Sequence, residues 1–182
     1  MAEEIAPREV YGRTLVELGK ENPDVVVLDA DLKPSTMTYY FEKEFPERFF
    51  EVGIAEQNMI GIACGLAASG KIPFASTFAV FAPGRCFDQS RVSVAQARLN
   101  VKIVVTHAGL TVGEDGASHQ ALEDLSLVCS LPGFTVIVPA DGIETAQAIR
   151  AVAAHDGPCY VRLCRHNLPV IYDNIYKFQI GK

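Results

Sequence analysis

The feature that most constrains the fold is an alternation of short apolar runs with longer helical patterns. Val25–Leu28, Val101–Val105 and Val136–Val138 are almost continuously apolar, which is typical of parallel strands covered on both faces. We expect strands at 25–28, 49–52, 72–76, 102–106, 135–138 and 160–163, and helices over 8–21, 55–68, 85–99, 120–130 and 143–154. Such alternation indicates βαβ units with right-handed crossovers. The predicted fold class is therefore α/β, with three layers and a mainly parallel sheet of about six strands between two layers of helices.

Length and charge limit the classes of function. The chain has 182 residues, which suits one domain, predicted over residues 1–168 with a linker or C-terminal extension over 169–182. The formal net charge is -6 and no basic cluster is present, which argues against nucleic acid as a partner.

Targeting signals are missing from the sequence. The start, Met1–Ile5, lacks the basic and apolar regions of a signal peptide, and the apolar stretch at 59–68 is too short to cross a bilayer. Five scattered cysteines form no C-x-x-C pair, so neither a zinc site nor a disulfide framework is predicted. We expect a protein of the reducing cytoplasm, with no membrane partner.

Glu56 stands at the start of an otherwise apolar helical segment, directly behind the strand predicted at 49–52. From Met59 to Ala68 every side chain is apolar or absent. A helix that is apolar all round is normally buried, so we expect a carboxyl group at its N-terminus to be poorly solvated. Such carboxyl groups are common at sites that move protons. For Glu56 taken alone, a structural role as a partner of the helix dipole is the alternative.

Chemically distinctive residues follow most of the predicted strands. In open α/β sheets, ligands bind outside the carboxyl ends of the strands. The residues at these positions are Asp29 and Asp31, Glu56, Phe78 and Phe81, His107 with the segment Gly113–Gln120, and Arg165. The strand assignments therefore predict one edge that collects acids, aromatic rings, two histidines and an arginine.

Each of these residues also has a structural interpretation. Phe78 and Phe81 suit stacking on a flat ring, but phenylalanine is usually buried in the core. The Gly113–Gln120 segment suits close approach to a ligand, and equally a surface turn. His107 and His119 lack a third metal ligand at a sensible spacing, so acid–base chemistry or hydrogen bonding to hydroxyl groups fits them better. A buried, hydrogen-bonded structural role stays open for each histidine.

Three motifs in order resemble a known family. They are Ile54-Ala55-Glu56-Gln57-Asn58 after a glycine, Ser76-Thr77-Phe78-x-x-Phe81, and Gly113-Glu114-Asp115-Gly116-x-x-His119-Gln120. Together they resemble the pyrimidine-binding domain of thiamine-diphosphate enzymes, most closely transketolase, over about Arg8 to Leu168. The segments Asp31–Ser35 and Leu163–Leu168 look similar to transketolase as well.

The resemblance implies an activity and a role for each site residue. The implied activity is transfer of a two-carbon ketol unit from a ketose phosphate to an aldose phosphate. Glu56 would bond the aminopyrimidine ring of thiamine diphosphate and act in catalysis with His119. The cofactor would be held by Glu56, Phe78, Phe81 and Asp31. Among the substrate-binding residues, Arg8, Ser35, His107 and Arg165 would hold the sugar phosphate, since arginine fits phosphate oxygens. Asp115 would read the configuration of the sugar hydroxyl near the donor carbonyl.

The chain departs from the family pattern in two ways. Gly84 occupies a position where the family often has a tyrosine, which affects one wall of the pyrimidine pocket. The Gly-Asp-Gly…Asn motif that holds Mg²⁺ and the diphosphate is missing; Asp141-Gly142 with Asn167 is only a superficial match, because Ala140 replaces the leading glycine. No metal ligand is therefore assigned here. We expect a partner diphosphate-binding domain or subunit to hold the Mg²⁺, a homodimer or partner-dependent assembly, and an isolated chain without activity.

Two other interpretations remain open at this point. The same domain occurs in 1-deoxyxylulose-5-phosphate synthase and in the β subunit of 2-oxo-acid dehydrogenases, although Leu122-Glu123-Asp124 after His119 looks more like transketolase. A stand-alone regulatory or interaction domain with a relic site is the alternative that involves no enzyme.

Overall fold

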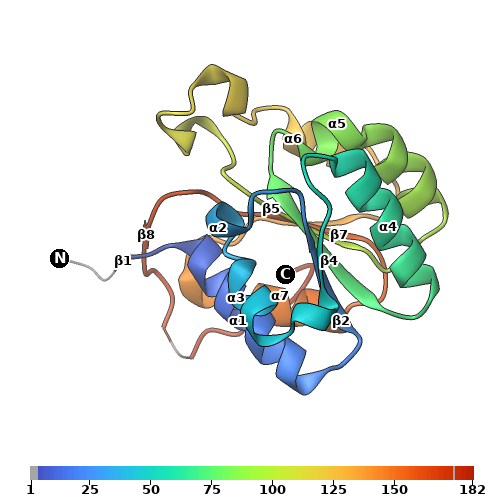
Figure 1. Ribbon diagram of the computed structural model, residues 1–182. Helices are drawn as coiled ribbons and strands as arrows, with labels where there is room; N and C mark the ends of the chain where they lie inside the picture. The colour runs from blue at the N-terminus through green and yellow to red at the C-terminus, as the bar shows by residue number, and fades with distance from the viewer. Residues whose placement is uncertain (1–3, 174) are drawn as a thin grey trace.

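A six-stranded parallel sheet forms the centre of the molecule, described over residues 4–173 and 175–182 by a computed structural model (Figure 1). Its strand order is β3-β2-β4-β5-β7-β6, and every neighbouring pair is parallel. The bounds are β2 (Val25–Asp29), β3 (Phe49–Glu51), β4 (Ile72–Phe78), β5 (Lys102–Thr106), β6 (Thr135–Ile137) and β7 (Cys159–Arg162). The predicted α/β class and the predicted parallel sheet are both confirmed.

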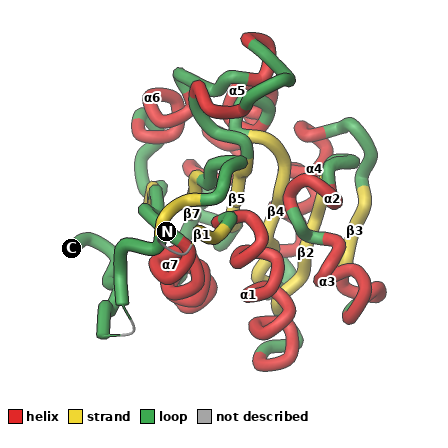
Figure 2. The backbone as a smooth tube through the Cα atoms, turned by 90° about the vertical axis from the view of Figure 1, so that its left-hand side faces the viewer, coloured by secondary structure: helices red, strands yellow, loops and turns green. Residues whose placement is uncertain are grey.

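Helices cover both faces of this sheet. One layer contains α4 (Glu56–Ala68), α5 (Ala82–Gln89) and α6 (Asp124–Cys129), and the other contains α1 (Pro7–Glu21), α3 (Tyr39–Glu44) and α7 (Gly142–Ala154). Figure 2 shows α1 and α7 side by side in front of the strands. A hydrophobic core lies on each face of the sheet, and every strand can contribute to both because successive side chains point to opposite faces. Leu28 and Ala75 belong to the core on the α4 side, whereas Val27 and Phe74 belong to the core on the α1 side.

A lysine is buried in the middle of the sheet. Lys102 in β5 is fully buried, and its ammonium group donates to the carbonyl oxygens of His155 (2.6 Å) and Gly157 (2.7 Å). Buried charges need such partners. Lys102 therefore ties the end of α7 to the central strands.

Several helices differ from the prediction. The segment between β2 and β3 contains α2 (Lys33–Thr36) and α3, which are too short to give a clear periodic pattern. The helix expected over 85–99 begins earlier, at Ala82 with Pro83 in its first turn, and continues from Ser90 to Gln96 as a π-helix. The helix expected over 120–130 begins only at Asp124, because a 3-10 turn occupies 117–119 and Gln120 is extended.

A second, two-stranded sheet joins the start of the described chain to the segment just before the C-terminal tail. β1 (Glu4–Ile5) pairs antiparallel with β8 (Leu168–Pro169), an element that the sequence did not predict. The segment beyond β8 runs back over α7, where Asp141 Oδ2 accepts the N–H groups of Ile171 and Tyr172, each at 2.8 Å. Its Oδ1 accepts Glu144 N–H at 2.8 Å and caps α7. Asp141 is thus occupied by backbone contacts. Within the described ranges, no helix has the length and apolar character needed to span a bilayer.

Candidate functional site

The carboxyl ends of the strands open into two adjacent cavities. The cofactor cavity, as we name it, has a volume of about 390 Å³ and is lined by Asp31, Glu56, Phe81, Arg85, Ser118 and His119, with Ala30, Leu32 and Ile54. The anion cavity, of about 660 Å³, is lined by Glu4, Arg8, Gly113, Glu114, Arg165, His166 and Asn167. The structure therefore brings most of the predicted site residues to one edge, as the strand assignments indicated.

Glu56 is the buried acid of the cofactor cavity. A turn at Gly53, with φ of 69°, leads from β3 towards α4, and Glu56 is the first residue of that helix. Its side chain is buried, with the residue only 3% exposed. The Oε1 atom accepts a hydrogen bond from Arg85 Nη1 at 2.7 Å. A buried carboxylate is thus held at the cavity wall by one cation.

Arg85 is a residue of the candidate site that the sequence did not indicate. Its guanidinium carbon lies 3.9 Å from the centroid of the Phe81 ring, close enough for a cation–π contact. Its backbone carbonyl accepts Gln57 Nε2 at 2.8 Å. The available signal was the spacing: a cation four residues after an aromatic side chain lies on the same face where the chain is helical.

Two phenylalanines and two histidines form one aromatic cluster. The rings of Phe78 and Phe81 are 5.8 Å apart and nearly parallel, and Phe78 also stacks on His107 at 3.9 Å. His119 meets Phe81 edge-on at 5.3 Å. Phe78 is buried, whereas Phe81 faces the cofactor cavity. Phe81 therefore lies at the wall of the cofactor cavity, with Arg85 stacked on its ring and the ring of Phe78 nearly parallel to it.

His107 is neutral at physiological pH. Burial, followed by the positive charges of Arg8 and Arg165, lowers its pKa to about 4, and the exposed Asp115 opposes this effect. Its Nδ1 is 2.8 Å from Thr106 Oγ1. The backbone at His107 has a φ of 60°, an uncommon conformation for a residue other than glycine. A neutral imidazole can both donate and accept hydrogen bonds.

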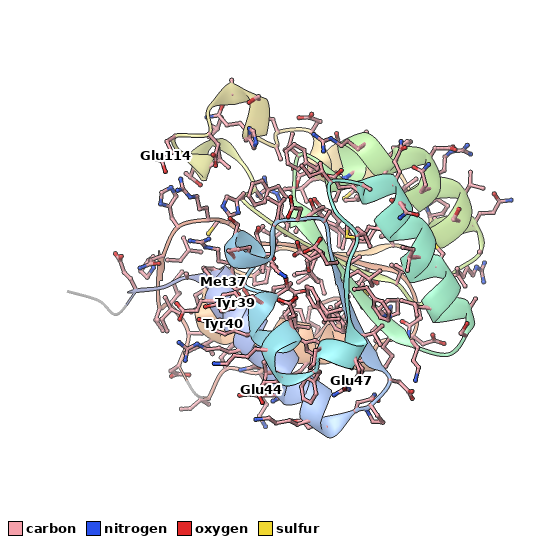
Figure 3. The ribbon with its side chains drawn as sticks, viewed as in Figure 1. Met37, Tyr39, Tyr40, Glu44, Glu47 and Glu114 are labelled. Carbon is pink, nitrogen blue, oxygen red and sulfur yellow. The ribbon has the colours of Figure 1, made fainter. Side chains whose placement is uncertain are left out.

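Arg8 and Arg165 share the anion cavity. Arg8 Nη1 donates to the carbonyl oxygen of Ser35 at 3.0 Å, while its buried Nε has no hydrogen-bond partner among the described residues. Arg165 donates to Val112 O at 2.7 Å and to Glu114 Oε1 at 3.0 Å. Figure 3 labels Glu114 on the outer loop beside this cavity. Two nearby guanidinium groups make the cavity suited to an anion.

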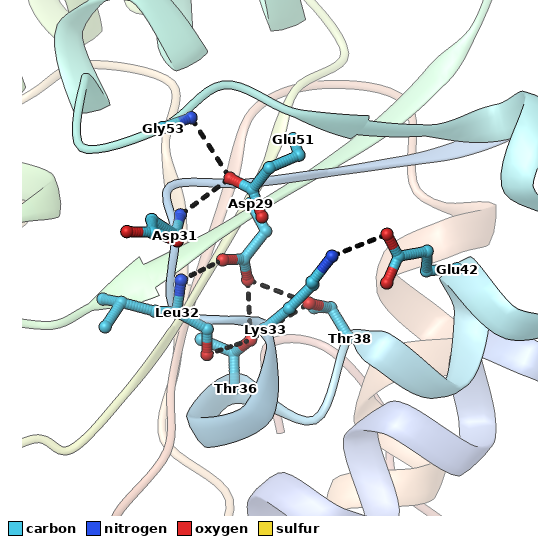
Figure 4. Close-up of polar contacts among 9 residues, drawn as sticks. All are labelled: Asp29, Asp31, Leu32, Lys33, Thr36, Thr38, Glu42, Glu51 and Gly53. Carbon is cyan, nitrogen blue, oxygen red and sulfur yellow. Dashed lines mark hydrogen bonds and ion pairs between the residues drawn. The ribbon is translucent and has the colours of Figure 1, made fainter.

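The loop that carries Asp31 is fixed by two carboxylates (Figure 4). Asp29 Oδ1 accepts Leu32 N–H at 2.6 Å, and Oδ2 accepts the hydroxyls of Thr36 (2.6 Å) and Thr38 (2.9 Å). Glu51 Oε1 accepts the N–H groups of Asp31 (2.8 Å) and Gly53 (3.1 Å). Asp31 itself has a φ of 62°. These contacts hold the cavity wall formed by Ala30, Asp31 and Leu32.

The side chains that line the two cavities suit an organic ligand with an aromatic ring and an anionic group. In the described part of the chain, no group of three or more His, Cys, Asp or Glu side chains is arranged to hold a metal. A buried acid beside an aromatic face suits a flat ring with a basic nitrogen, and the adjoining arginines suit a phosphate. Ser35 contributes its carbonyl to Arg8, and Asp115 is exposed on the glycine-rich loop.

Comparison with known proteins agrees with this arrangement. The family model for the transketolase pyrimidine-binding domain matches residues 3–170. The "Putative transketolase C-terminal section" of Methanocaldococcus jannaschii is 55% identical over 177 residues, which cover 96% of this chain and 56% of that protein. The chain thus spans about half the length of that relative.

Two solved structures share the fold. One, described as "Split gene transketolase, inactive beta4 tetramer", superimposes with a TM-score of 0.88 at 54% identity, covering 98% of this chain and 57% of the other. The transketolase of Campylobacter jejuni superimposes with a TM-score of 0.88 at 29% identity, covering 97% of this chain and 28% of that transketolase. Since the family model spans nearly the whole sequence and the fold agrees with it, the chain belongs to the family of transketolase pyrimidine-binding domains.

Proposed function

We propose that this chain supplies the pyrimidine-binding half of a transketolase active site, which transfers a two-carbon ketol unit from a ketose phosphate to an aldose phosphate. The observation that carries the proposal is the buried carboxylate of Glu56 lining the same cavity as Phe81 and His119. The alternative of a relic site receives no support from this cavity, because its acid, its aromatic face and its histidine are all present.

The cofactor cavity fits the aminopyrimidine ring of thiamine diphosphate. When bound, this cofactor supplies the carbon nucleophile for attack on the ketose carbonyl. Glu56 would hold a proton against a ring nitrogen, which its burial at the helix start allows. Phe81, supported by Phe78, would stack on the ring, and the wall that carries Asp31 would close the far side.

The adjoining cavity fits the sugar phosphate. Arg8 and Arg165 would bind the phosphate group, because their guanidinium groups match its oxygens. His107, being neutral, would hydrogen-bond sugar hydroxyls, and His119 would exchange a proton near the reacting atoms. Asp115 would contact a hydroxyl from the glycine-rich loop. Ser35 would lie beside the phosphate group, because its carbonyl oxygen accepts a hydrogen bond from Arg8.

A partner is needed to complete the site. Because the sequence lacks the Gly-Asp-Gly…Asn motif, Mg²⁺ and the diphosphate would be held by a diphosphate-binding domain or subunit. The chain would form a homodimer or a partner-dependent assembly. The outward face of α4 is exposed at Gly61, Gly65 and Ala68, and this smooth face suits close packing against another chain.

We place this assembly in the cytoplasm, because all five cysteines are free thiols.

The test is a reconstituted assay in which a diphosphate-binding partner is added to the chain. We expect turnover of xylulose 5-phosphate with ribose 5-phosphate, and a loss of about 100-fold or more in Glu56→Gln, since general acid–base groups contribute at least that much. The matched control is Glu47→Gln, an exposed acid at the opposite end of the molecule from Glu114 (Figure 3). Full activity in Glu56→Gln would contradict the proposal.

The same assay separates the related enzymes. Turnover of pyruvate in place of the ketose phosphate would instead favour 1-deoxyxylulose-5-phosphate synthase or a 2-oxo-acid dehydrogenase β subunit. For the chain alone, calorimetric titration with thiamine diphosphate and Mg²⁺ should give only weak binding. A submicromolar Kd without the partner would rule out a shared site.

A further inference from the structure

We propose that the Arg85 guanidinium occupies the place of the aminopyrimidine ring while the chain is without cofactor, and that it withdraws when the ring binds. This inference rests on the proposed function and adds a residue that sets the apparent affinity for the cofactor. Arg85 would act as a placeholder: it protects an empty site and competes with the group that fills it.

The contacts of Arg85 are those that the ring itself would make. Its guanidinium stacks against Phe81, with 3.9 Å between the guanidinium carbon and the ring centroid. It also donates a hydrogen bond of 2.7 Å to Glu56 Oε1. A guanidinium is planar, delocalised and rich in N–H donors, properties that it shares with an aminopyrimidine. The two groups cannot hold the same face of Phe81 and the same carboxylate at once.

Burial explains why the empty site keeps a cation. The side chain of Glu56 is only 4% exposed, and a buried carboxylate without a partner is strongly destabilising. In the described part of the chain, Arg85 provides the only hydrogen bond to this carboxylate. The placeholder therefore compensates a charge that the bound ring would otherwise satisfy.

Arg85 has room to leave. Its side chain is 46% exposed, whereas its backbone is held by the contact with Gln57. It also lines a further cavity of about 460 Å³ formed with residues 54–58, so Arg85 borders both this space and the cofactor cavity. A rotation about the side-chain bonds would move it from one cavity to the other while α5 stays in place.

The first experiment measures cofactor binding to the chain assembled with its diphosphate-binding partner. The apparent Kd equals the intrinsic Kd divided by the fraction of molecules whose site is free. If Arg85 blocks the site in roughly two thirds to nine tenths of the molecules, Arg85→Met should bind thiamine diphosphate with Mg²⁺ about threefold to tenfold more tightly than wild type. The control is Arg91→Met, which removes an exposed arginine that pairs with Asp88. Equal or weaker binding by Arg85→Met would overturn the placeholder.

The second experiment needs no partner and no turnover. The full chain is titrated with the isolated aminopyrimidine half of thiamine, and the Nε–H signals of Arg85 and Arg91 are followed by NMR. We expect the Arg85 signal to move to the position of a free guanidinium while Arg91 stays unchanged. Because salt weakens the exposed part of an ion pair, added salt should strengthen fragment binding to wild type and leave Arg85→Met unaffected.

The outcomes separate this inference from the proposed function. If the assembled wild type binds cofactor and Arg85→Met binds it no better, only the placeholder fails. If neither the cofactor nor the fragment binds to wild type or to either variant, the pyrimidine site itself is wrong and both proposals fail. An Arg85 signal that is unchanged while the fragment binds elsewhere would also overturn the placeholder.

Discussion

Asp29 is a buried acid whose titration opposes folding. Burial raises its pKa to about 6, even though Leu32, Thr36 and Thr38 donate hydrogen bonds to it. In the unfolded chain a carboxyl group of this type titrates near 3.8. Between these two values the native state binds more protons than the unfolded state, so the free energy of unfolding falls as pH rises.

Asp29→Asn should remove this pH dependence. The asparagine keeps an acceptor for Leu32 N–H and donors for the two threonine hydroxyls, so the loop should keep its shape. Relative to this variant, wild type should lose on the order of 2–3 kcal/mol of unfolding free energy between about pH 4 and pH 6. Urea unfolding across that range checks the effect. Parallel pH profiles for the two proteins would show that Asp29 does not titrate in this window.

His107 has the opposite slope. Its pKa of about 4, lowered first by burial and then by Arg8 and Arg165, lies below that of an unfolded histidine. The unfolded state therefore binds more protons, and stability is lost as pH falls from about 6.5 towards 4.

His107→Asn should abolish that loss, which we expect to be on the order of 2–3 kcal/mol. Asparagine tolerates the positive φ at this position and can still contact Thr106. Because the slopes of Asp29 and His107 oppose each other, wild type should show a flatter stability profile than either single variant. The variant that carries both substitutions should again show little change of unfolding free energy with pH. A steep pH profile in wild type would contradict the opposing effects of Asp29 and His107.

At the residue scale, most of the site could be predicted because parallel strands bring their carboxyl ends to one edge. Glu56, Phe81 and His119 line one cavity for that reason. Arg85 was missed because its partner is far away in sequence: Glu56 precedes it by 29 residues, and only the folded chain brings them together. The contacts of Asp29 with Leu32, Thr36 and Thr38 could not be predicted either. A run of short polar residues does not indicate which carboxylate they hydrogen-bond.

At the scale of elements, Asp141 connects α7 with the segment that follows β8. Burial alone would raise the pKa of Asp141, but hydrogen bonds from four backbone N–H groups, including those of Glu144, Ile171 and Tyr172, hold it below the ordinary value. One side chain thus caps a helix and anchors the end of the chain.

Two substitutions separate these contributions. Asp141→Ala removes the cap and the anchor, and should cost about 2–4 kcal/mol. Asp141→Asn keeps a single acceptor oxygen, so it can serve α7 or the tail but not both, and should cost about half as much. Urea unfolding gives the energies, and hydrogen exchange at Ile171 and Tyr172 reports the anchor. Asp156→Asn, an exposed acid, is the control. Wild-type exchange and stability in Asp141→Asn would refute the dual role.

Elements were predictable where the sequence carries a strong period. β2, β5 and β6 are rich in β-branched residues, and β3, β4 and β7 carry apolar or aromatic residues between turn signals. All six strands were located from these short runs. β1 and β8 have two residues each, which is too short for any period, and they are far apart in the sequence. No Gly or Pro stands where α5 changes to the π-helix at Ser90, so the sequence carries no signal for that change.

At the scale of the whole molecule, α4 has an outer face that is exposed and free of bulky side chains at two glycines. A side-chain carbon added at Gly61 or Gly65 would meet no other atom within 4 Å, and Ile54, just before the helix, is 75% exposed. The buried face of α4 already packs against the sheet. An apolar helix with a smooth outer face is what the proposed partner would need for close approach.

Gly65→Leu therefore separates folding from assembly. Leucine is a better helix former than glycine by about 0.8 kcal/mol, so the chain alone should become slightly more stable. Its bulk on the α4 face should clash with the partner and weaken assembly about tenfold or more, a change of at least roughly 1.4 kcal/mol. Sedimentation of the chain alone and with the diphosphate-binding partner measures this effect. Ala154→Leu, on an exposed site of α7, should assemble normally, and normal assembly of Gly65→Leu would exclude this face as the interface.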